Sequence, residues 1–298
     1  MAHPIRHYRE IEFEYGRCDT VSPLIRRVIA ENPTPFTYRG TGTYIVGRGN
    51  VAVIDPGPDI PEHVEALFKA VEGETITHIF VTHTHRDHSP AVRHVKARAD
   101  VPAFGFGPHG KHGPKVEEGP DYDFTPDVAL KDGDIVRGDG WTIEAVHTPG
   151  HTSNHMCFAL HEEKALLSGD HIMGWSTTVV SPPDGDMHAY IESLKKVLGR
   201  DDDIIWPTHG PPITDPKRYV AELIAHRAER EAEIVACLEN GIGRIPDMVE
   251  TIYADVPQRL HNAAGRSVYA HLIHMVKTGR ALCEGDGAPA PDSEYRLP

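Results

Sequence analysis

The first two thirds of the chain alternate between short apolar runs and segments with helical spacing. Apolar runs of a few residues, bounded by polar or turn-forming residues, are typical of buried strands. Longer segments whose apolar residues recur every three or four positions are typical of helices packed on a sheet. We expect strands at 36–47, 51–55, 76–82, 101–106, 135–136, 141–147, 155–160 and 165–168, and helices at 61–71, 91–98 and 189–198. This alternation predicts an α/β fold.

Two long segments without periodicity interrupt the pattern, at 107–125 and 175–187. Both are rich in glycine, proline and polar residues, which indicates loops. Loops of this length inside a compact domain are often functional. We therefore expect the second loop, near Trp175 and Met187, to form a wall of a substrate pocket.

The pattern changes after Pro212. Segments 216–238, 248–253 and 260–278 are predicted to be helices, the middle one short. Three such helices resemble a helix-turn-helix or winged-helix module. The alternative is a helical cap that covers the first part of the chain and shapes its pocket, and we favour the cap over nucleic-acid binding. We predict two domains, 1–212 and 213–298.

Metal-binding side chains are concentrated directly after the apolar run 76–81. The imidazoles of His83, His85 and His88 and the carboxylate of Asp87 fall within six positions. His83 and His85 alternate along extended backbone, so both can face one ion. Asp87 and His88 lie where the chain must turn, and could face a second. Neutral imidazole and carboxylate are ligands that zinc and similar divalent ions prefer.

Further candidate ligands follow other predicted strands. His151, Asp170 and His209 each come after a short apolar run, and Asp55 ends the run 51–54 in the same way. Side chains at strand ends can converge on one edge of a sheet, where a rigid scaffold holds them and loops shape a pocket.

The order of these motifs resembles the metallo-β-lactamase superfamily of dinuclear hydrolases. The matching segments are His-x-His-x-Asp-His at 83–88, Gly-His-Thr at 150–152, Gly-Asp at 169–170, Thr-His-Gly at 208–210 and the turn at 54–57. The resemblance implies a four-layer αβ/βα sandwich with metals at one edge of its two sheets. It also implies that His83, His85 and His151 bind one ion. Asp87, His88 and His209 would bind a second, and Asp170 would bridge the two.

Such a site implies metal-dependent hydrolysis. Two divalent ions about 3.5–4 Å apart can share a water and lower its pKa from about 15.7 toward 7. The metal-bridging hydroxide would attack a small ester or thioester, and Asp87 would orient it. Zinc is the favoured metal, because histidine-rich sites with two carboxylates suit it, but iron and manganese also fit. No cysteine is among the ligands, which removes one feature that would favour zinc strongly.

Shorter matches place the chain nearer one branch of the superfamily. Asp87-His88-Ser89, the segment 190–194 and Ala270-His271-Leu272 resemble the β-lactamase-like-protein-2 branch. That branch includes a single-strand endoribonuclease and relatives described as glyoxalase II-like or thioesterase-like. We favour a hydroxyacylglutathione-hydrolase-like esterase or thioesterase. The alternatives are RNA phosphodiester cleavage, a mononuclear iron oxidation, and a metal-binding or regulatory protein without catalysis.

Charge and composition favour a small-molecule substrate. The net charge of −14 repels phosphate backbones on average, and the three tryptophans are spread out rather than grouped for stacking on bases. The four cysteines form no Cys-x-x-Cys pair, which fits a reducing compartment. No apolar leader and no run of membrane-spanning length is evident, so we expect a cytoplasmic protein without membrane partners.

Overall fold

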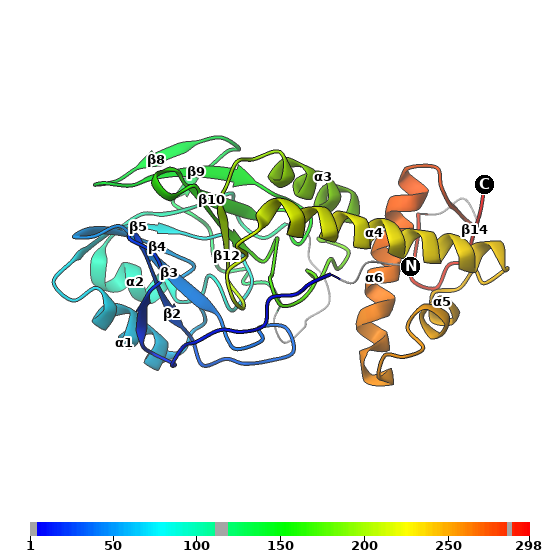
Figure 1. Ribbon diagram of the computed structural model, residues 1–298, viewed down its shortest axis with the longest axis horizontal. Coiled ribbons are helices and arrows are strands. Elements are labelled where there is room, and N and C mark those ends of the chain that lie inside the picture. The colour runs from blue at the N-terminus through cyan, green and yellow to red at the C-terminus, as the bar shows by residue number, and fades with distance from the viewer. Residues whose placement is uncertain (1–4, 111–118, 285–287) are drawn as a thin grey trace.

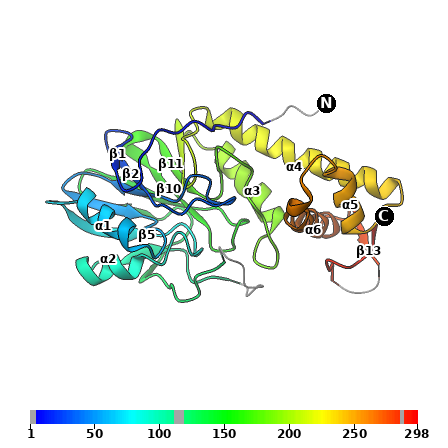
Figure 2. The same ribbon diagram turned by 90° about the horizontal axis from the view of Figure 1, so that it is seen from below.

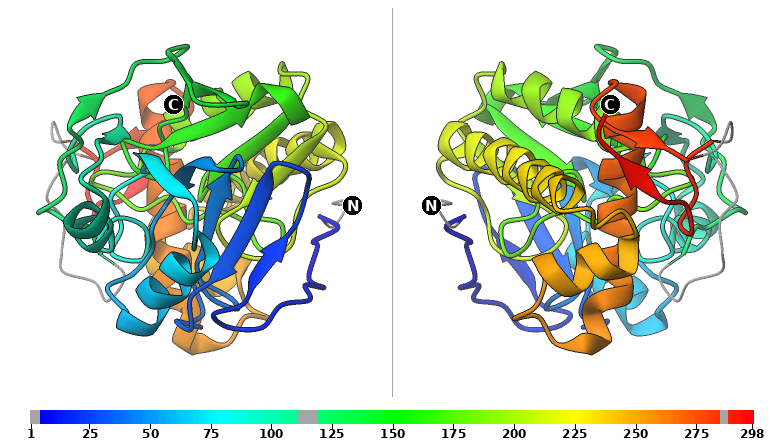
Figure 3. Two further views of the ribbon diagram at one scale, coloured as in Figure 1. Left: turned by 90° about the vertical axis from the view of Figure 1, so that its left-hand side faces the viewer. Right: turned by 90° about the vertical axis from the view of Figure 1, so that its right-hand side faces the viewer.

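The computed structural model describes residues 5–110, 119–284 and 288–298 (Figure 1). Its first part consists of two β-sheets packed face to face, with helices on the outer face of each (Figure 3). The first sheet has the order β1 (Cys18–Thr20), β2 (Ile25–Ile29), β3 (Gly42–Val46), β4 (Asn50–Ile54), β5 (Thr75–Phe80), β6 (Ala103–Gly105) and β7 (Val128–Ala129). The second has the order β12 (Ile204–Pro207), β11 (Ala165–Gly169), β10 (Met156–Leu160), β9 (Thr142–His147) and β8 (Ile135–Arg137). The four-layer sandwich predicted from the sequence is confirmed.

Alternation along the strands builds the layers. In β5, Phe80 packs between the two sheets, while its neighbour Ile79 packs under the outer helices. In β10, Phe158 faces the other sheet and Cys157 faces the opposite outer layer. Because successive side chains of a strand point to opposite faces, strands covered on both sides read as continuous apolar runs.

Helices complete the outer layers. α1 (Pro61–Ala70) and α2 (Val92–Ala99) bury Leu67 and Val95 against the first sheet. α3 (Met187–Leu198) and the first half of α4 (Pro216–Glu239) pack on the second sheet. Among the described residues, no helix is both long enough and apolar enough to cross a membrane.

The tail lies at one end of the molecule, far from α1 and α2 (Figure 2). It contains α5 (Ile245–Ile252), α6 (His261–Lys277) and a small hairpin of β13 (Leu282–Cys283) and β14 (Tyr295–Arg296). The second half of α4 shares an apolar core with α5 and α6, so this helix belongs to the cores of both parts. A domain boundary at residue 212 therefore stays a prediction.

The sequence pattern located most elements, with differences that have local causes. β2 was not predicted, because Arg26 and Arg27 interrupt its apolar residues; Arg27 is nevertheless buried against Gly42. The predicted strand 36–47 begins only at Gly42, because Thr34 and Thr37 hydrogen-bond each other's backbone and side chains in a turn. The predicted loop 107–125 includes residues 111–118, which lie outside the described residues.

Met187 corrects the expected extent of the second loop. The Asp186 side chain accepts a hydrogen bond from the backbone N–H of Ala189 at 3.0 Å, which caps α3 and places Met187 inside the helix. Met187 is buried against the second sheet and does not line a pocket. Trp175, at the other end of the predicted loop, does line one.

Gly150 allows close packing of α3 beside the β9–β10 connection. Its φ is +138°, and a Cβ built there would overlap the backbone of Tyr190. Glycine is the residue that tolerates both this conformation and this approach. The next residue is His151, so the same contact fixes the backbone position from which its imidazole extends.

We expect Gly150→Ala to destabilise the fold by about 3 kcal/mol or more, because backbone strain and overpacking coincide. Gly241→Ala is the matched control, since Gly241 also has positive φ (+75°) but nothing lies within 4 Å of its would-be Cβ. The control should lose about 1–2 kcal/mol. Urea denaturation would measure both free energies of unfolding, and equal losses would contradict the packing described here.

Candidate metal centre

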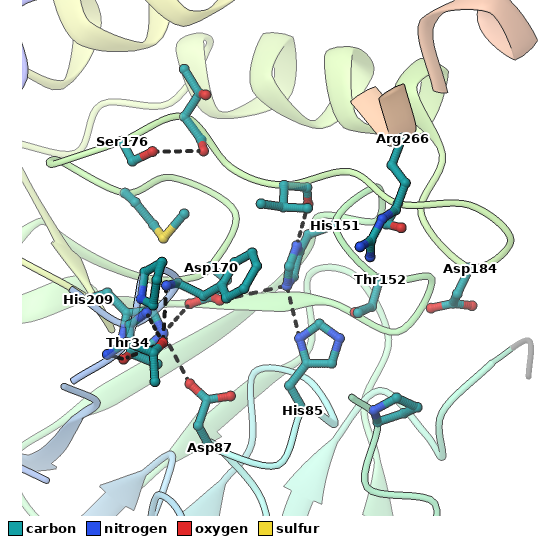
Figure 4. A pocket seen from close by; sticks show the side chains of 18 of the residues that line it. Thr34, His85, Asp87, His151, Thr152, Asp170, Ser176, Asp184, His209 and Arg266 are labelled. Atoms are coloured by element: carbon teal, nitrogen blue, oxygen red, sulfur yellow. Dashed lines mark hydrogen bonds and ion pairs between the residues drawn. The ribbon is translucent and has the colours of Figure 1, made fainter. Parts of the chain in front are cut away.

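The predicted ligands meet at one edge of the two sheets, at the floor of a pocket of about 510 Å³ (Figure 4). β5 ends just before His83, β11 just before Asp170, and β12 just before His209. His151 lies in the connection between β9 and β10. Strand ends from both sheets thus deliver side chains that are far apart in the sequence.

One group of four side chains comes together on one side of this floor. His83, His85, His151 and Asp170 each offer a ligand atom within 4.8 Å of the others. His85 Nδ1 lies 2.9 Å from His83 Nε2 and 3.1 Å from His151 Nε2. Asp170 Oδ2 lies 3.7 Å from His151 Nε2.

A second group adjoins the first. Asp87, His88 and His209 also offer ligand atoms within 4.8 Å of one another. Asp87 Oδ2 is 3.1 Å from His209 Nε2 and 3.3 Å from His88 Nε2. Asp170 turns its other oxygen, Oδ1, toward this group, 3.4 Å from His209 Nε2 and 3.5 Å from His88 Nε2. The carboxylate of Asp170 therefore stands between the two groups, as a bridging ligand would.

Hydrogen bonds on the outer side of the rings determine which nitrogen faces inward. The Nδ1–H groups of His88, His151 and His209 donate to Asp55 Oδ2 (2.8 Å), Val179 O (2.6 Å) and Gly40 O (3.1 Å). Those oxygens only accept, so in the neutral rings each Nε2 carries a lone pair. Thr82 Oγ1 already donates to Asp55, so it accepts from His83 Nδ1 and leaves His83 Nε2 unprotonated as well.

These inward lone pairs fit divalent cations. The buried atoms His88 Nε2 and Asp170 Oδ1 have no hydrogen-bond partner in the described part of the chain. A buried polar atom left without a partner costs about 1–3 kcal/mol, so such an arrangement normally has a reason. Imidazoles with two carboxylates suit zinc, iron or manganese. The residues present therefore fit two divalent ions.

The electrostatics of the two groups support the same conclusion. Burial, reinforced by neighbouring imidazoles, lowers the pKa of His83 well below its usual value and that of His85 to about 3, so both rings are neutral. Burial also opposes charge on His88, but the carboxylates of Asp87 and Asp170 outweigh it and hold its pKa well above the usual value. The carboxylates thus favour positive charge here, which a proton or a metal ion can supply. Acidification should therefore compete with metal binding.

Asp55 lies beneath the centre; its place at a strand end was noted in the sequence, but it was assigned to neither ion. Its carboxylate accepts hydrogen bonds from Thr82 N and Thr82 Oγ1, both at 2.7 Å, as well as from His88. It thereby fixes the end of β5 and the orientation of a ligand ring. The sequence signal for this role was its position directly after a strand, a position that the assigned ligands also occupy.

The loop after Asp170 connects the centre to the helical tail. Thr178 Oγ1 donates to the carbonyl of Asp170 at 2.8 Å, and buried Arg227 of α4 donates to the carbonyl of Thr178 at 2.6 Å. The next carbonyl, of Val179, accepts from His151. The tail therefore helps to orient His151 and Asp170, a link that residue spacing could not reveal.

The pocket walls are largely apolar. Trp175 stacks on Tyr38 with ring centroids 4.9 Å apart, while Phe36 and Val179 present exposed apolar side chains to the pocket. His109 also lines it. So does Arg266, which α6 contributes from the tail.

Known proteins are similar to this chain in sequence and in fold. Residues 38–209 match the metallo-beta-lactamase superfamily, and residues 245–288 match the beta-lactamase associated winged helix domain. A beta-lactamase-like protein 2 homolog from Caenorhabditis elegans is 34% identical over 271 residues, covering 88% of this chain and 87% of that protein. An atrochrysone carboxyl ACP thioesterase from Paecilomyces divaricatus is 31% identical over 244 residues, covering 80% of this chain and 73% of that protein.

Solved structures show the same architecture over nearly the whole length. The crystal structure of a beta-lactamase domain protein from Burkholderia ambifaria superposes with a TM-score of 0.79 at 21% identity, covering 98% of this chain and 97% of that one. That likeness concerns the fold, while the sequence matches carry the family. The chain therefore belongs to the metallo-β-lactamase superfamily, as a hydrolase with an associated winged-helix domain.

Proposed function

We propose that this protein is a dinuclear metal-dependent hydrolase of small esters or thioesters. The observation that carries the proposal is the pair of ligand groups joined by Asp170 at the floor of an apolar pocket. Relatives described as acyl carrier protein thioesterases support the thioester. Zinc is the favoured ion, with iron or manganese as alternatives.

The metal ligands, Asp87 and the apolar walls would each have a distinct role in hydrolysis. Ions held by the two groups would supply Lewis acidity and lower the pKa of a water in the pocket. Asp87 directs Oδ2 toward His209 and His88 and accepts a hydrogen bond from Thr41 Oγ1 at 3.1 Å. Its Oδ1 has no hydrogen-bond partner in the described part of the chain, so it can accept a proton from the nucleophilic water and orient it. The apolar walls would exclude bulk water from the substrate carbonyl.

Cleavage of single-stranded RNA is the second candidate, and the winged-helix domain is the observation that favours it. Binding along a phosphate backbone needs several cationic side chains. Arg266 is the one arginine or lysine among the described residues that line the pocket, and the whole chain carries a charge of −14. These charges favour the small substrate.

All four cysteines are free, which supports a reducing compartment such as the cytoplasm.

The first test is thiol release from a panel of acyl thioesters, including lactoylglutathione and short-chain acyl coenzyme A compounds, with zinc-loaded protein. We expect release from at least one member, and its loss on adding a chelator. His83→Ala and Asp170→Asn should each reduce turnover by orders of magnitude without loss of the fold, because each removes a ligand. His161→Ala is the control, since that ring lies at the surface beside Glu144.

Circular dichroism would verify that each variant is folded. Full turnover in either ligand variant would refute the ligand assignment. No thiol release from any member, with metal shown to be bound, would refute thioester hydrolysis, and a fluorescent single-stranded RNA would then test the second candidate.

A separate prediction concerns Asp55. Asp55→Asn should weaken metal binding about 10- to 100-fold, because the amide is a poorer acceptor for His88 Nδ1–H and no longer orients that ring as firmly. Asp59→Asn is the matched control. Asp59 lies on the same β4–α1 connection as Asp55, but it pairs with exposed Arg93 and His94 and not with a ligand. Competition with a chromophoric chelator measures both affinities. An affinity equal to that of the unmodified protein would show that Asp55 serves only the fold.

A further inference from the structure

The pocket has one cationic feature, and the winged-helix domain supplies it. The floor carries imidazoles and carboxylates, and the walls carry Phe36, Trp175 and Val179. Arg266 extends from α6 into the same pocket, toward the side where His151, Thr152 and Asp184 lie (Figure 4). Among the described lining residues, it is the one arginine or lysine.

The position of Arg266 is fixed by the packing of its helix. Ala264 and Val268, on either side of it in α6, are buried in the core of the tail, and Ala270 is buried against the second sheet. α6 also contacts α3, whose first turn follows the pocket loop. The guanidinium is therefore carried by a backbone held against both parts of the molecule.

Arg266 has no acidic partner among the described residues, as is also true of Arg227 and Arg244, whereas three other arginines of the tail are paired. Arg218, Arg230 and Arg280 pair with Glu222, Glu233 and Glu231 at 2.9, 2.6 and 2.5 Å. No carboxylate of the described residues lies within 4.0 Å of the Arg266 guanidinium, in a chain with 44 acidic and 30 basic residues. Asp184 lines the same pocket, but its carboxylate accepts from Ser153 N at 2.9 Å and Ser153 Oγ at 2.7 Å.

An arginine of this kind matches an anionic group on a ligand. A guanidinium presents a planar fork of N–H donors that fits carboxylate or phosphate oxygens in bidentate fashion. Arg266 is exposed, so its guanidinium is accessible to such a group. The same pocket has apolar walls, so it suits a molecule that combines an apolar section with a negative charge.

We infer that the substrate is an acyl thioester that carries a carboxylate or phosphate group away from the scissile bond, and that Arg266 binds this group. This inference rests on the proposed thioester hydrolysis. It gives the winged-helix domain a direct role in choosing the substrate. The anion could belong to the acyl group, as a terminal carboxylate, or to the thiol carrier, as a phosphate.

Matched substrates separate these sources. One acyl chain would be presented as its coenzyme A thioester, which carries phosphates, and as its N-acetylcysteamine thioester, which is neutral. A third substrate would be an N-acetylcysteamine thioester whose acyl chain ends in a carboxylate. Arg266→Gln, Arg266→Lys and the control Lys277→Gln would be compared with the unmodified protein. Lys277 is on the same helix and forms only an exposed 3.8 Å contact with Asp186.

We expect Arg266→Gln to raise KM about 10-fold for the anionic substrate, with little change in kcat, because the amide cannot form the charge-assisted contact with the anion. The neutral thioester should be unaffected, Arg266→Lys should recover part of the loss, and Lys277→Gln should behave as the unmodified protein. A loss with coenzyme A alone assigns the phosphate, and a loss with the acyl carboxylate alone assigns the carboxylate.

Equal losses on neutral and anionic substrates would overturn the inference, because Arg266 would then act only on the fold. So would no loss on any of them, and in both cases thioester hydrolysis would stand. If the unmodified protein hydrolysed no thioester, the proposed function would fail. Calorimetric binding of non-hydrolysable thioether analogues of the three substrates would then decide the role of Arg266, because tighter binding of an anionic analogue must disappear in Arg266→Gln.

Discussion

The structure depends most on histidine rings whose inner nitrogens direct lone pairs toward the candidate metal centre. His83, His88, His151 and His209 each use the outer ring nitrogen in a hydrogen bond, so in the neutral ring the inner nitrogen carries a lone pair. Two buried carboxylates share the same space. Such a cluster is unfavourable without positive charge between its members, and the sandwich supplies the rigid strand ends that hold it in place. We regard the demand for cations as the reason that this edge of the fold is built as it is.

The helical tail contributes side chains both to the support of the centre and to the pocket. Arg227 of α4 holds the carbonyl of Thr178, one residue before the carbonyl that orients His151. Arg266 of α6 then contributes a cation to the pocket itself. The winged-helix domain therefore contributes to the wall of the pocket above the candidate metal centre. Helix α4 connects the two parts, because its first half packs on the second sheet and its second half packs in the core of the tail.

The sequence revealed what local spacing determines. Side chains directly after apolar runs, such as His83, Asp170 and His209, could be identified because a strand end fixes where the next residue points. Arg266 could not, because its position depends on how α6 packs across the molecule. Asp55 was noticed at its strand end but had no partner until β5 and His88 were placed beside it. β2 was missed because burial of the long Arg27 side chain is a tertiary effect, and Met187 was misplaced because the capping role of Asp186 was overlooked.

The central claim is that the two side-chain groups hold two ions, and counting them is its most direct test. Native mass spectrometry of the zinc-titrated protein would give the number of ions bound to each chain at saturation. We predict two ions per chain, the second completing the group of Asp87, His88 and His209. A single ion at saturation, or none, would contradict the dinuclear site and the reaction derived from it.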